Sequence, residues 1–574
     1  MKKLTNVIIP LFLLSLVSCS DVAKKDITIV YTNDIHGYIA NEGGLKVSNV
    51  AGYVESLEKE GKDVLLVDAG DEFQGSVYGA IDKGEDMIDI MNAAGYDLAT
   101  PGNHDFDFGM DAFSSFVEEA NYPYVSCNFH YAKQDSTVLE PYKIFDVGGV
   151  KIGFVGVSTP TTITSSTPKY FQDENGDFAY GFYGSDNPLD LYETVQHAID
   201  LIERKVDYVI GLGHLGVGTD EEKKGVTSTA VIRNTKGFDA FIDGHSHTKI
   251  ENRLIKTKED KDCLLTQASC YLEAFGEMTI SSNGEISAKL ISETEYQNAQ
   301  VKAIEDTIVS RVDEEMGKKI AVNENELYVN NPEVEGQRII RARETNLADL
   351  CSDSMYWYLN DSKELDCDIA LVNGGGIRKE IKAGDVTLGD VKSTHPFGNQ
   401  ICLIKTKGKN IKDAIEMGSN VIGEWDDLYD CPAENGGFLH IAGMRYKIDA
   451  DIPSSVTTDE NGMFSSVSGE YRVKDLEVYD QRSASYEPLE LEKYYLVAGN
   501  NYILRNSGNG MSMFDDSENI LDYIDEDYVV LAEYIKAFEN QTINNGNSPL
   551  SHYENYLFDY ENPLGSGRII IENL

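Results

Sequence analysis

The sequence predicts an α/β fold for the first half of the chain and a mixed α+β domain for the second half. Between residue 26 and about residue 290, short apolar segments alternate with helical or loop segments, which is the pattern of an α/β domain. A stretch of helical composition follows, and mixed strand and helix candidates lie beyond it. The chain has 574 residues, so we expect at least two domains.

Six short segments of the first half are the strand candidates. They cover residues 27–32, 63–69, 97–100, 151–157, 206–212 and 238–243. Most are rich in Val, Ile, Leu and Phe, and each is followed by polar or glycine residues that would end a strand. We therefore expect a sheet whose strands are separated by helices over residues 26–295.

Residues 296–318 contain no Gly or Pro before Gly317. Val301, Ile304, Ile308 and Val312 fall at helical spacing, which predicts a linking helix with one buried stripe. The second domain should cover residues 319–574 and end in a strand over 567–573. Residues 459–470 are rich in Gly and Ser, and we expect them to form a surface loop.

Composition excludes several classes of protein. A hydrophobic fraction of 41% and a charged fraction of 25% are globular values, unlike those of disordered or fibrous chains. With 49 Lys and Arg against 97 Asp and Glu, the net charge of -48 disfavours binding to duplex nucleic acid or to an anionic membrane surface. An anionic substrate would need a locally positive pocket, which metal ions and arginines could supply.

The first eighteen residues carry two lysines and then an apolar run, which is typical of a secretory signal peptide. Residues 16–19, LVSC, resemble the bacterial lipobox, which implies cleavage before Cys19 and lipid attachment to its thiol. Residues 19–25 would then tether an extracytoplasmic body to a bacterial cell membrane. The alternative is an ordinary signal peptide with an incidental cysteine.

Polar clusters follow five of the strand candidates. Because ligands of an open α/β sheet bind beyond the carboxyl ends of its strands, these clusters should meet at one place. They offer a set of oxygen and nitrogen donors: Asp34, His36, Asp71, Asn103, His104, Asp107, His214, His245 and His247.

His245 and His247 would point the same way on an extended strand, so both could reach one point. Two imidazoles alone cannot complete a metal shell, and a hydrogen-bonded turn is the alternative. Donors without cysteine suit zinc, manganese or iron. Two ions need roughly seven ligands, and a carboxylate such as Asp71 can bridge ions about 3.5 to 4 Å apart, so the supply matches a dinuclear centre.

These ordered motifs resemble those of calcineurin-like metallophosphoesterases. The runs 101-PGNHDFDFG-109, 373-NGGGIR-378 and 396-PFGN-399 resemble the branch of 5′-nucleotidases, UDP-sugar hydrolases and 2′,3′-cyclic phosphodiesterases. The resemblance covers nearly all of the chain that follows the signal segment. It implies a four-layer α/β/β/α sandwich over residues 26–295 and an α+β substrate-specificity domain over residues 319–574.

The resemblance also implies roles for single residues. One metal would be held by Asp34, His36, Asp71 and His247, and the other by Asp71, Asn103, His214 and His245, with Asp71 as the bridge. Some family members have Gln or Asn at the place of His247. His104 and Asp107 would form a dyad that stabilises charge on the transferring phosphoryl group, and no covalent enzyme intermediate is needed.

In the second domain the resemblance points to a substrate-binding set: Arg341, Asn373, Arg378, Phe397, Asn399, Tyr502 and Asn509. Arg338 and Arg343 are further candidates. Phe397 and Tyr502 would stack on a nucleobase. Asn509 stands where the family commonly has an aspartate, so nucleoside recognition is expected to differ.

The sequence thus predicts a lipid-anchored enzyme with two divalent metal ions, such as zinc or manganese, that hydrolyses nucleotides to nucleoside and phosphate. Two alternatives within the class are hydrolysis of 2′,3′-cyclic nucleotides and of UDP-sugars; action on sulfur-containing adducts is less favoured. A surface binding lipoprotein without catalysis is the alternative from another class. We further expect the two domains to face one another and to hinge near the linking helix.

Overall fold

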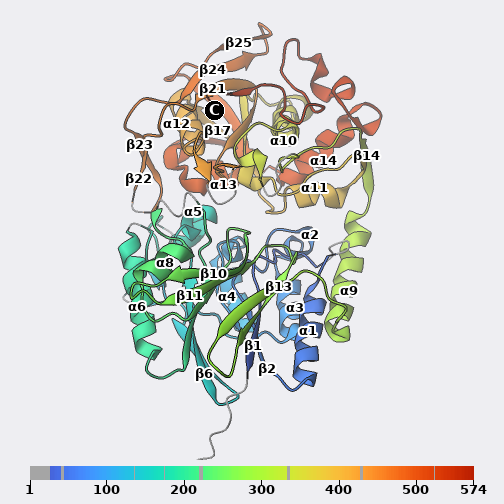
Figure 1. Ribbon diagram of the computed structural model, residues 1–574. Coiled ribbons are helices and arrows are strands. Elements are labelled where there is room, and N and C mark those ends of the chain that lie inside the picture. The colour runs from blue at the N-terminus through green and yellow to red at the C-terminus, as the bar shows by residue number, and fades with distance from the viewer. Residues whose placement is uncertain are drawn as a thin grey trace, which may run out of the picture.

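The computed structural model describes residues 26–39, 44–134, 136–173, 175–185, 187–218, 224–332, 337–426, 431–459, 461–521 and 524–573. The expected signal peptide, tether and lipidated Cys19 lie outside these residues. Figure 1 shows two bodies, the first half of the chain below and the second half above. Within the described ranges, no helix has the length and apolar character needed to cross a membrane.

The lower body contains two sheets. The first has the strand order β13-β12-β1-β2-β3, and the second has the order β10-β11-β9-β8-β6-β5. The strands of the first sheet are β1 (Ile27–Thr32), β2 (Asp63–Asp68), β3 (Leu98–Ala99), β12 (Phe275–Ile280) and β13 (Ile286–Ile291). Those of the second are β5 (Tyr142–Val147), β6 (Val150–Ser158), β8 (Tyr208–His214), β9 (Ala240–Ile242), β10 (Lys249–Lys256) and β11 (Asp262–Ala268). All six strand candidates of the first half are confirmed, with small shifts at their ends.

The two sheets pack face to face through one apolar core. Ile29 and Val67 from the first sheet and Phe154, Ile210 and Leu212 from the second belong to this core, and all five are fully buried. Burying each such side chain contributes about 1.5–3 kcal/mol. The outer face of the first sheet is covered by α1 (Val47–Lys59) and α3 (Glu85–Ala94), and that of the second by α6 (Pro188–Ile202) and α8 (Ser228–Asn234). The expected α/β/β/α sandwich is therefore confirmed.

Helix α6 shows how sequence places these outer helices. Asn187 caps the helix, since its side chain accepts a hydrogen bond from Leu189 N at 3.2 Å. Pro188 occupies the first turn, where its missing N–H costs nothing. Leu191, Val195 and Ile199 recur at intervals of four and face the second sheet.

Helix α9 (Ala299–Met316) is the linking helix and runs along the side of the molecule between the two bodies (Figure 1). Val301, Ile308 and Val312 are buried in the core that contains residues of α1 and α3, and Ile304 packs against it. The predicted buried stripe is confirmed. Asn298 caps the helix, which is why it begins three residues later than expected.

The upper body is built on a mixed sheet with the order β20-β15-β26-β17-β27. Its strands are β15 (Ile369–Asn373), β17 (Ile401–Lys407), β20 (Leu439–Ala442), β26 (Tyr494–Asn500) and β27 (Glu518–Leu521). Two helices, α10 (Asn346–Trp357) and α14 (Asp527–Ala537), share one core with this sheet, and α12 (Gly408–Gly418) lies in a second core. The closing strand is confirmed as β29 (Ile569–Glu572), which pairs in parallel with β21 (Met444–Asp449).

The surface loop expected over residues 459–470 is wrong in part. β22 (Val456–Thr458) and β23 (Phe464–Val467) form a hairpin whose turn lies against α5 (Thr162–Ser165) of the lower body. A β-carbon added at Gly462 would lie 3.2 Å from Thr164 Cγ2. Ser and Thr can pair across strands through their hydroxyls, as Thr457 and Ser466 do at 2.9 Å, so a Ser-rich segment need not be a loop.

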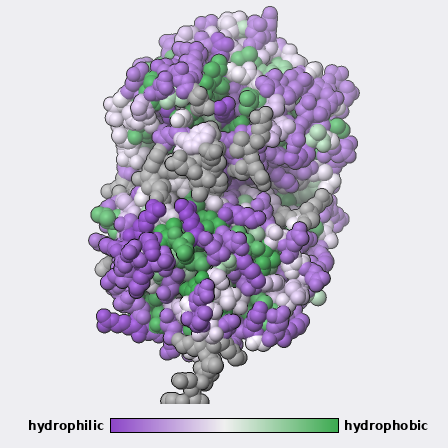
Figure 2. Space-filling model, in the orientation of Figure 1, coloured by the Kyte–Doolittle hydropathy of each residue, from purple (hydrophilic) through white to green (hydrophobic). Residues whose placement is uncertain are grey.

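Hydrophilic residues cover most of the face shown in Figure 2, in keeping with the strongly charged composition. The site described below lies between the two bodies.

Candidate active site

The predicted donors lie at the carboxyl ends of the strands, on the edge of the sandwich that faces the upper body. Loops after β1, β2 and β9 carry acidic and imidazole side chains, His214 is the last residue of β8, and Asn103 and His104 follow β3. The structure brings Asp34, His36, Asp71, His214 and His247 into two overlapping groups.

The first group consists of Asp34, His36 and His247. Asp34 Oδ1 lies 3.3 Å from His247 Nε2 and 3.8 Å from His36 Nε2, and the two Nε2 atoms are 3.1 Å apart. Asp34 and His36 are fully buried. Two imidazole nitrogens and a carboxylate oxygen that converge in this way can ligate one cation.

The second group is centred on Asp71 and His214. Asp71 Oδ2 lies 3.1 Å from His214 Nε2 and 3.7 Å from His36 Nε2, so one carboxylate oxygen faces both groups. Asp34 Oδ1 is 3.9 Å from His214 Nε2, which brings Asp34 into reach of both groups as well; the expected ligand sets gave it to one metal only. The His245 ring lies 5.2 Å from the His214 ring.

Several atoms of the site fit bound cations. Asn103 Oδ1 is buried and has no hydrogen-bond partner within the described part of the chain, and the buried His214 Nε2 faces the Asp71 carboxylate. The other ring nitrogens are occupied: His36 Nδ1 meets Gln74 O, and His214 Nδ1 meets Ala69 O, both at 2.6 Å. A carbonyl can only accept, so each Nδ1 carries a proton and each Nε2 is the ring nitrogen that faces the site. Burial alone would lower the pKa of His214, but the Asp71 and Asp34 carboxylates raise it to about 10, a sign of the negative charge that a cation here would balance.

The protonation state of His36 also favours a bound cation. Burial holds the pKa of His36 well below its usual range, although the neighbouring Asp71 carboxylate favours the charged form. The imidazole is therefore neutral near pH 7, which is the form that ligates metals.

The backbone of the site lies in an uncommon conformation. Five of the predicted ligands have positive φ: Asp34 at 50°, His36 at 53°, Asp71 at 60°, His245 at 78° and His247 at 57°. Such conformations cost about 1–3 kcal/mol each and concentrate at functional sites. His245 and His247 do not lie on an extended strand, since both follow the end of β9 in this left-handed conformation. Their rings accordingly approach different partners, His214 and His36.

Asp105 holds part of this strained backbone in place, and the sequence analysis missed it. Its carboxylate accepts hydrogen bonds from the N–H groups of Asp71 at 3.0 Å, Glu72 at 2.9 Å and Gly102 at 2.7 Å. Its position inside the 103-NHDFD-107 run was a usable signal. Asn33 is a second such residue, because its amide donates to Asp34 Oδ2 at 2.7 Å and to Ser269 O at 2.6 Å.

His104 and Asp107 lie together, as expected for a dyad. His104 Nδ1 is 2.6 Å from Asp107 Oδ2, and Ser166 Oγ donates to Asp107 Oδ1 at 2.7 Å. The backbone N–H of His104 donates to Asp71 Oδ1 at 2.7 Å, which ties the dyad to the ligand groups. With Asp107 on Nδ1, the Nε2 edge of His104 is left to act on a substrate.

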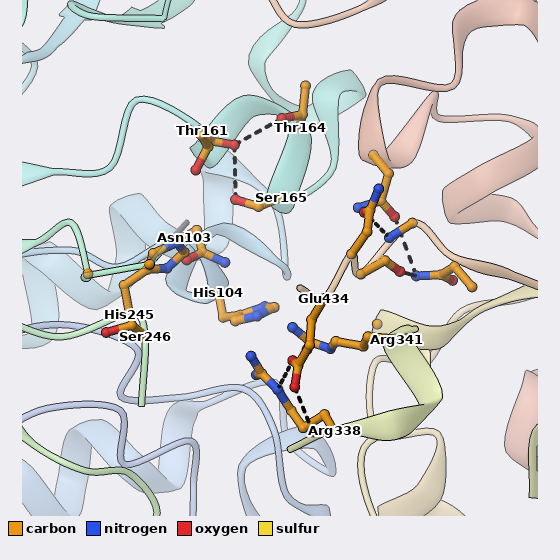
Figure 3. Close-up of a pocket in the computed structure, with 18 of the residues that line it drawn as sticks. Asn103, His104, Thr161, Thr164, Ser165, His245, Ser246, Arg338, Arg341 and Glu434 are labelled. Carbon is orange, nitrogen blue, oxygen red and sulfur yellow. Dashed lines mark hydrogen bonds and ion pairs between the residues drawn. The ribbon is translucent and has the colours of Figure 1, made fainter. Parts of the chain in front are cut away.

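A cavity of about 1490 Å³ separates the two bodies and is lined by both. Figure 3 shows Asn103, His104 and His245 on one side and Arg338, Arg341 and Glu434 on the other. Arg338 Nε donates to Glu434 Oε2 at 2.8 Å. Burial lowers the pKa of Arg341, and the nearby Arg338 and Arg378 guanidinium groups lower it further. The cavity of this acidic chain thus has a cationic wall.

Phe397 lies between the two bodies. The centre of its ring is 5.6 Å from that of His104 and 5.6 Å from Arg378 Cζ. The loop that carries Phe397 is fixed at Asn399, whose backbone oxygen accepts a hydrogen bond from Asp527 N at 2.8 Å.

Tyr502 reaches the lower body through its hydroxyl group. The hydroxyl donates to Thr164 O at 3.0 Å and accepts from Asn509 N at 3.1 Å. The Tyr502 ring packs against Gly508, because a β-carbon added at Gly508 would lie 2.5 Å from carbons of the ring. The predicted stacking residue therefore also connects the two bodies.

Tyr271 is a site residue that the sequence analysis did not find. Its ring lies 5.4 Å from His36 and 5.3 Å from His247, and its hydroxyl hydrogen-bonds to Arg378 of the upper body. Nothing in the sequence distinguishes it among 33 tyrosines, because the loop that carries it is brought to the site only by the fold.

Comparison with known proteins agrees with this geometry. The family model of calcineurin-like phosphoesterases matches residues 27–249, and that of the 5′-nucleotidase C-terminal domain matches residues 324–516. The chain is 27% identical to the trifunctional nucleotide phosphoesterase protein YfkN of Bacillus subtilis over 565 residues, which are 90% of this chain and 34% of that protein. The chain thus spans about a third of YfkN.

Two further relatives match over nearly their whole length. The 5′-nucleotidase of Rattus norvegicus is 27% identical, with 90% of this chain and 88% of the relative covered. The crystal structure of a 5′-nucleotidase precursor from Thermus thermophilus superposes with a TM-score of 0.74 at 26% identity, covering 96% of this chain and 100% of that one.

The chain therefore belongs to the calcineurin-like phosphoesterase family and carries a 5′-nucleotidase C-terminal domain. It is a metal-dependent phosphoric ester hydrolase.

Proposed function

We propose that this protein is a 5′-nucleotidase that hydrolyses nucleoside 5′-monophosphates to nucleoside and phosphate. One observation carries the proposal: the ligand groups of the lower body and the arginine and aromatic residues of the upper body line the same cavity. In a nucleoside monophosphate, one ester bond joins the reacting phosphoryl group to the nucleoside. The two walls of the cavity carry different side chains for these two parts of the substrate.

The ligand groups fit two divalent cations, with Asp34, His36, Asp71 and His247 around one and Asp71, Asn103, His214 and His245 around the other. When bound, such ions supply Lewis acidity and lower the pKa of a ligating water. Manganese, zinc and iron all suit the oxygen and imidazole donors.

The residues of the chain itself position and neutralise the substrate. Arg341 and Arg378 line the cavity and would pair with anionic oxygens, which gives this acidic chain a locally positive site. His104, oriented by Asp107 at Nδ1, would turn its Nε2 edge toward the transferring phosphoryl group. Phe397 and Tyr502 line the cavity and would stack on the nucleobase.

A substrate panel tests the proposal. The purified chain, supplied with manganese, zinc or cobalt, should release phosphate from AMP faster than it cleaves UDP-glucose or 2′,3′-cyclic AMP. A preference for either of the latter two would move the protein to the corresponding neighbouring activity. Binding of nucleotides without phosphate release under any metal would make it a binding protein and refute the enzyme.

We also propose that the protein is exported and held at a bacterial membrane by a lipid on Cys19. The support is the LVSC run at residues 16–19 after a signal-like segment. Expression of the full chain with labelled palmitate should label the wild type and leave Cys19→Ala unlabelled. Equal labelling of the two would contradict the anchor.

A further inference from the structure

A chain of three asparagine side chains runs from a helix cap to the wall of the cavity. Asn500 caps α13 (Asn501–Leu504), Asn373 ends β15, and Asn509 lies in the 3-10 turn Gly508–Gly510. Asn500 and Asn373 are 1% and 3% exposed, so their amides must find partners within the protein. Asn509 is half-buried and lines the cavity.

The helix cap fixes the direction of this chain. Asn500 Oδ1 accepts a hydrogen bond from Ile503 N at 3.0 Å, and a backbone N–H can only donate. The NH₂ group of Asn500 must therefore point away from the cap, and it donates to Asn373 Oδ1 at 3.3 Å. The amide of Asn373 is oriented in turn.

A second fixed group confirms the orientation of Asn373. Its Nδ2 donates to Gly436 O at 3.3 Å, and a backbone carbonyl can only accept. The same Nδ2 reaches Asn509 Oδ1 at 3.4 Å. Both ends of the chain thus dictate that the carbonyl of Asn509 faces Asn373.

Because the carbonyl of Asn509 faces Asn373, its Nδ2 group is left for another partner. No hydrogen-bond partner of this NH₂ group occurs in the part of the chain that the structure describes, and the residue lines the cavity. An aspartate at this position would present a carboxylate oxygen to the ligand, and that oxygen can only accept a hydrogen bond. Asn509 presents two N–H groups, which can only donate hydrogen bonds.

We propose that Asn509 is a specificity-determining residue that selects a hydrogen-bond acceptor on the nucleoside part of the substrate, the reverse of the preference an aspartate would give. The inference rests on the proposed nucleotidase function and deepens it. Two parts of a nucleotide can supply the acceptor: a keto oxygen on the base edge, or a ribose oxygen.

Asparagine also suits the backbone here, since φ at residue 509 is 54° and Asn tolerates the left-handed region. A purely conformational role would make the residue indifferent to the ligand. Glycine preserves that conformation and removes the amide, so Asn509→Gly serves as the matched control for Asn509→Asp.

The test measures kcat/KM for the wild type, Asn509→Asp and Asn509→Gly in two substrate arms. The base arm compares IMP with AMP, which exchanges a 6-keto acceptor for a 6-amino donor. The ribose arm compares 2′,3′-di-O-methyl AMP, whose ribose oxygens only accept, with AMP. Ratios within each protein cancel any general loss of activity.

In one arm the ratio of acceptor substrate to AMP should fall by at least about tenfold in Asn509→Asp relative to the wild type, with Asn509→Gly between them. The arm that responds identifies the source of the acceptor. Ratios that agree among all three proteins in both arms would overturn the inference while leaving the nucleotidase intact. A wild type that releases no phosphate from any nucleotide would refute the proposed function itself.

Discussion

The two walls of the cavity are built on different principles. The metal-facing wall comes from one body: most of its ligands are buried, its backbone is held in left-handed conformations, and hydrogen bonds of 2.6 Å fix His36, His214 and the dyad. The nucleoside-facing wall uses amide contacts of 3.3 to 3.4 Å and depends on Tyr502 reaching the other body. Chemistry is therefore pre-organised within one domain, whereas recognition depends on how the two bodies meet.

The largest effect should come from Asp71, whose carboxylate lies between His214 and His36. Asp71→Asn removes a carboxylate charge from the centre of the site, and we expect phosphate release to fall by at least about 10³-fold. Metal content, measured by mass spectrometry, should fall below that of the wild type. Equal activity of the two proteins would refute the metal-dependent mechanism.

The dyad should matter next. His104→Asn removes the imidazole that would stabilise charge on the phosphoryl group and should lower kcat by about 10²-fold to 10³-fold. Asp107→Asn leaves the imidazole in place but loosens its orientation, so about a tenfold loss is expected. Unlike Asp71→Asn, both variants should keep the metal content of the wild type. A loss of metal would show that His104 or Asp107 is a metal ligand.

The sequence was informative wherever a local pattern carried the feature. Strand alternation, the linking helix and the polar strand ends were visible because each depends on neighbouring residues. The left-handed backbone at Asp34 and His247 could not be predicted from the sequence, because tertiary contacts impose it against local preference. Tyr271 and Gly462 could not be found for a related reason: their contacts with His36 and Thr164 join segments that are distant in the sequence.

Acid should weaken the upper body through a buried histidine. Burial lowers the pKa of His440 to about 4, although its Nε2 lies 2.7 Å from Ile340 O. The unfolded chain takes up this proton near pH 6.5 and the folded chain only near pH 4, so stability is present above pH 6.5 and is lost as the pH falls between them.

The matched variant His440→Gln keeps a donor toward Ile340 O and does not titrate. The unfolding free energy of the wild type relative to His440→Gln should drop by about 3 kcal/mol from pH 7 to pH 4. Urea unfolding of both proteins at the two pH values measures this. Parallel pH profiles would show that His440 is not held neutral by the fold.

The smallest effect concerns the contact between the walls. Tyr502→Phe keeps the ring for stacking but loses the hydroxyl that meets Thr164 O, so kcat/KM for AMP should fall by about threefold to tenfold. Tyr502→Leu, which loses the ring as well, should fall further. If Tyr502→Phe matches the wild type, the residue acts by stacking alone.

In the proposed mechanism, five strand ends assemble a site for two ions around Asp71. Anomalous scattering from crystals soaked with manganese would locate both ions. We predict two peaks, one beside His36 and His247 and one beside Asn103, His214 and His245, with Asp71 between them. A single peak, or two peaks that Asp71 does not contact, would refute the two-ion site.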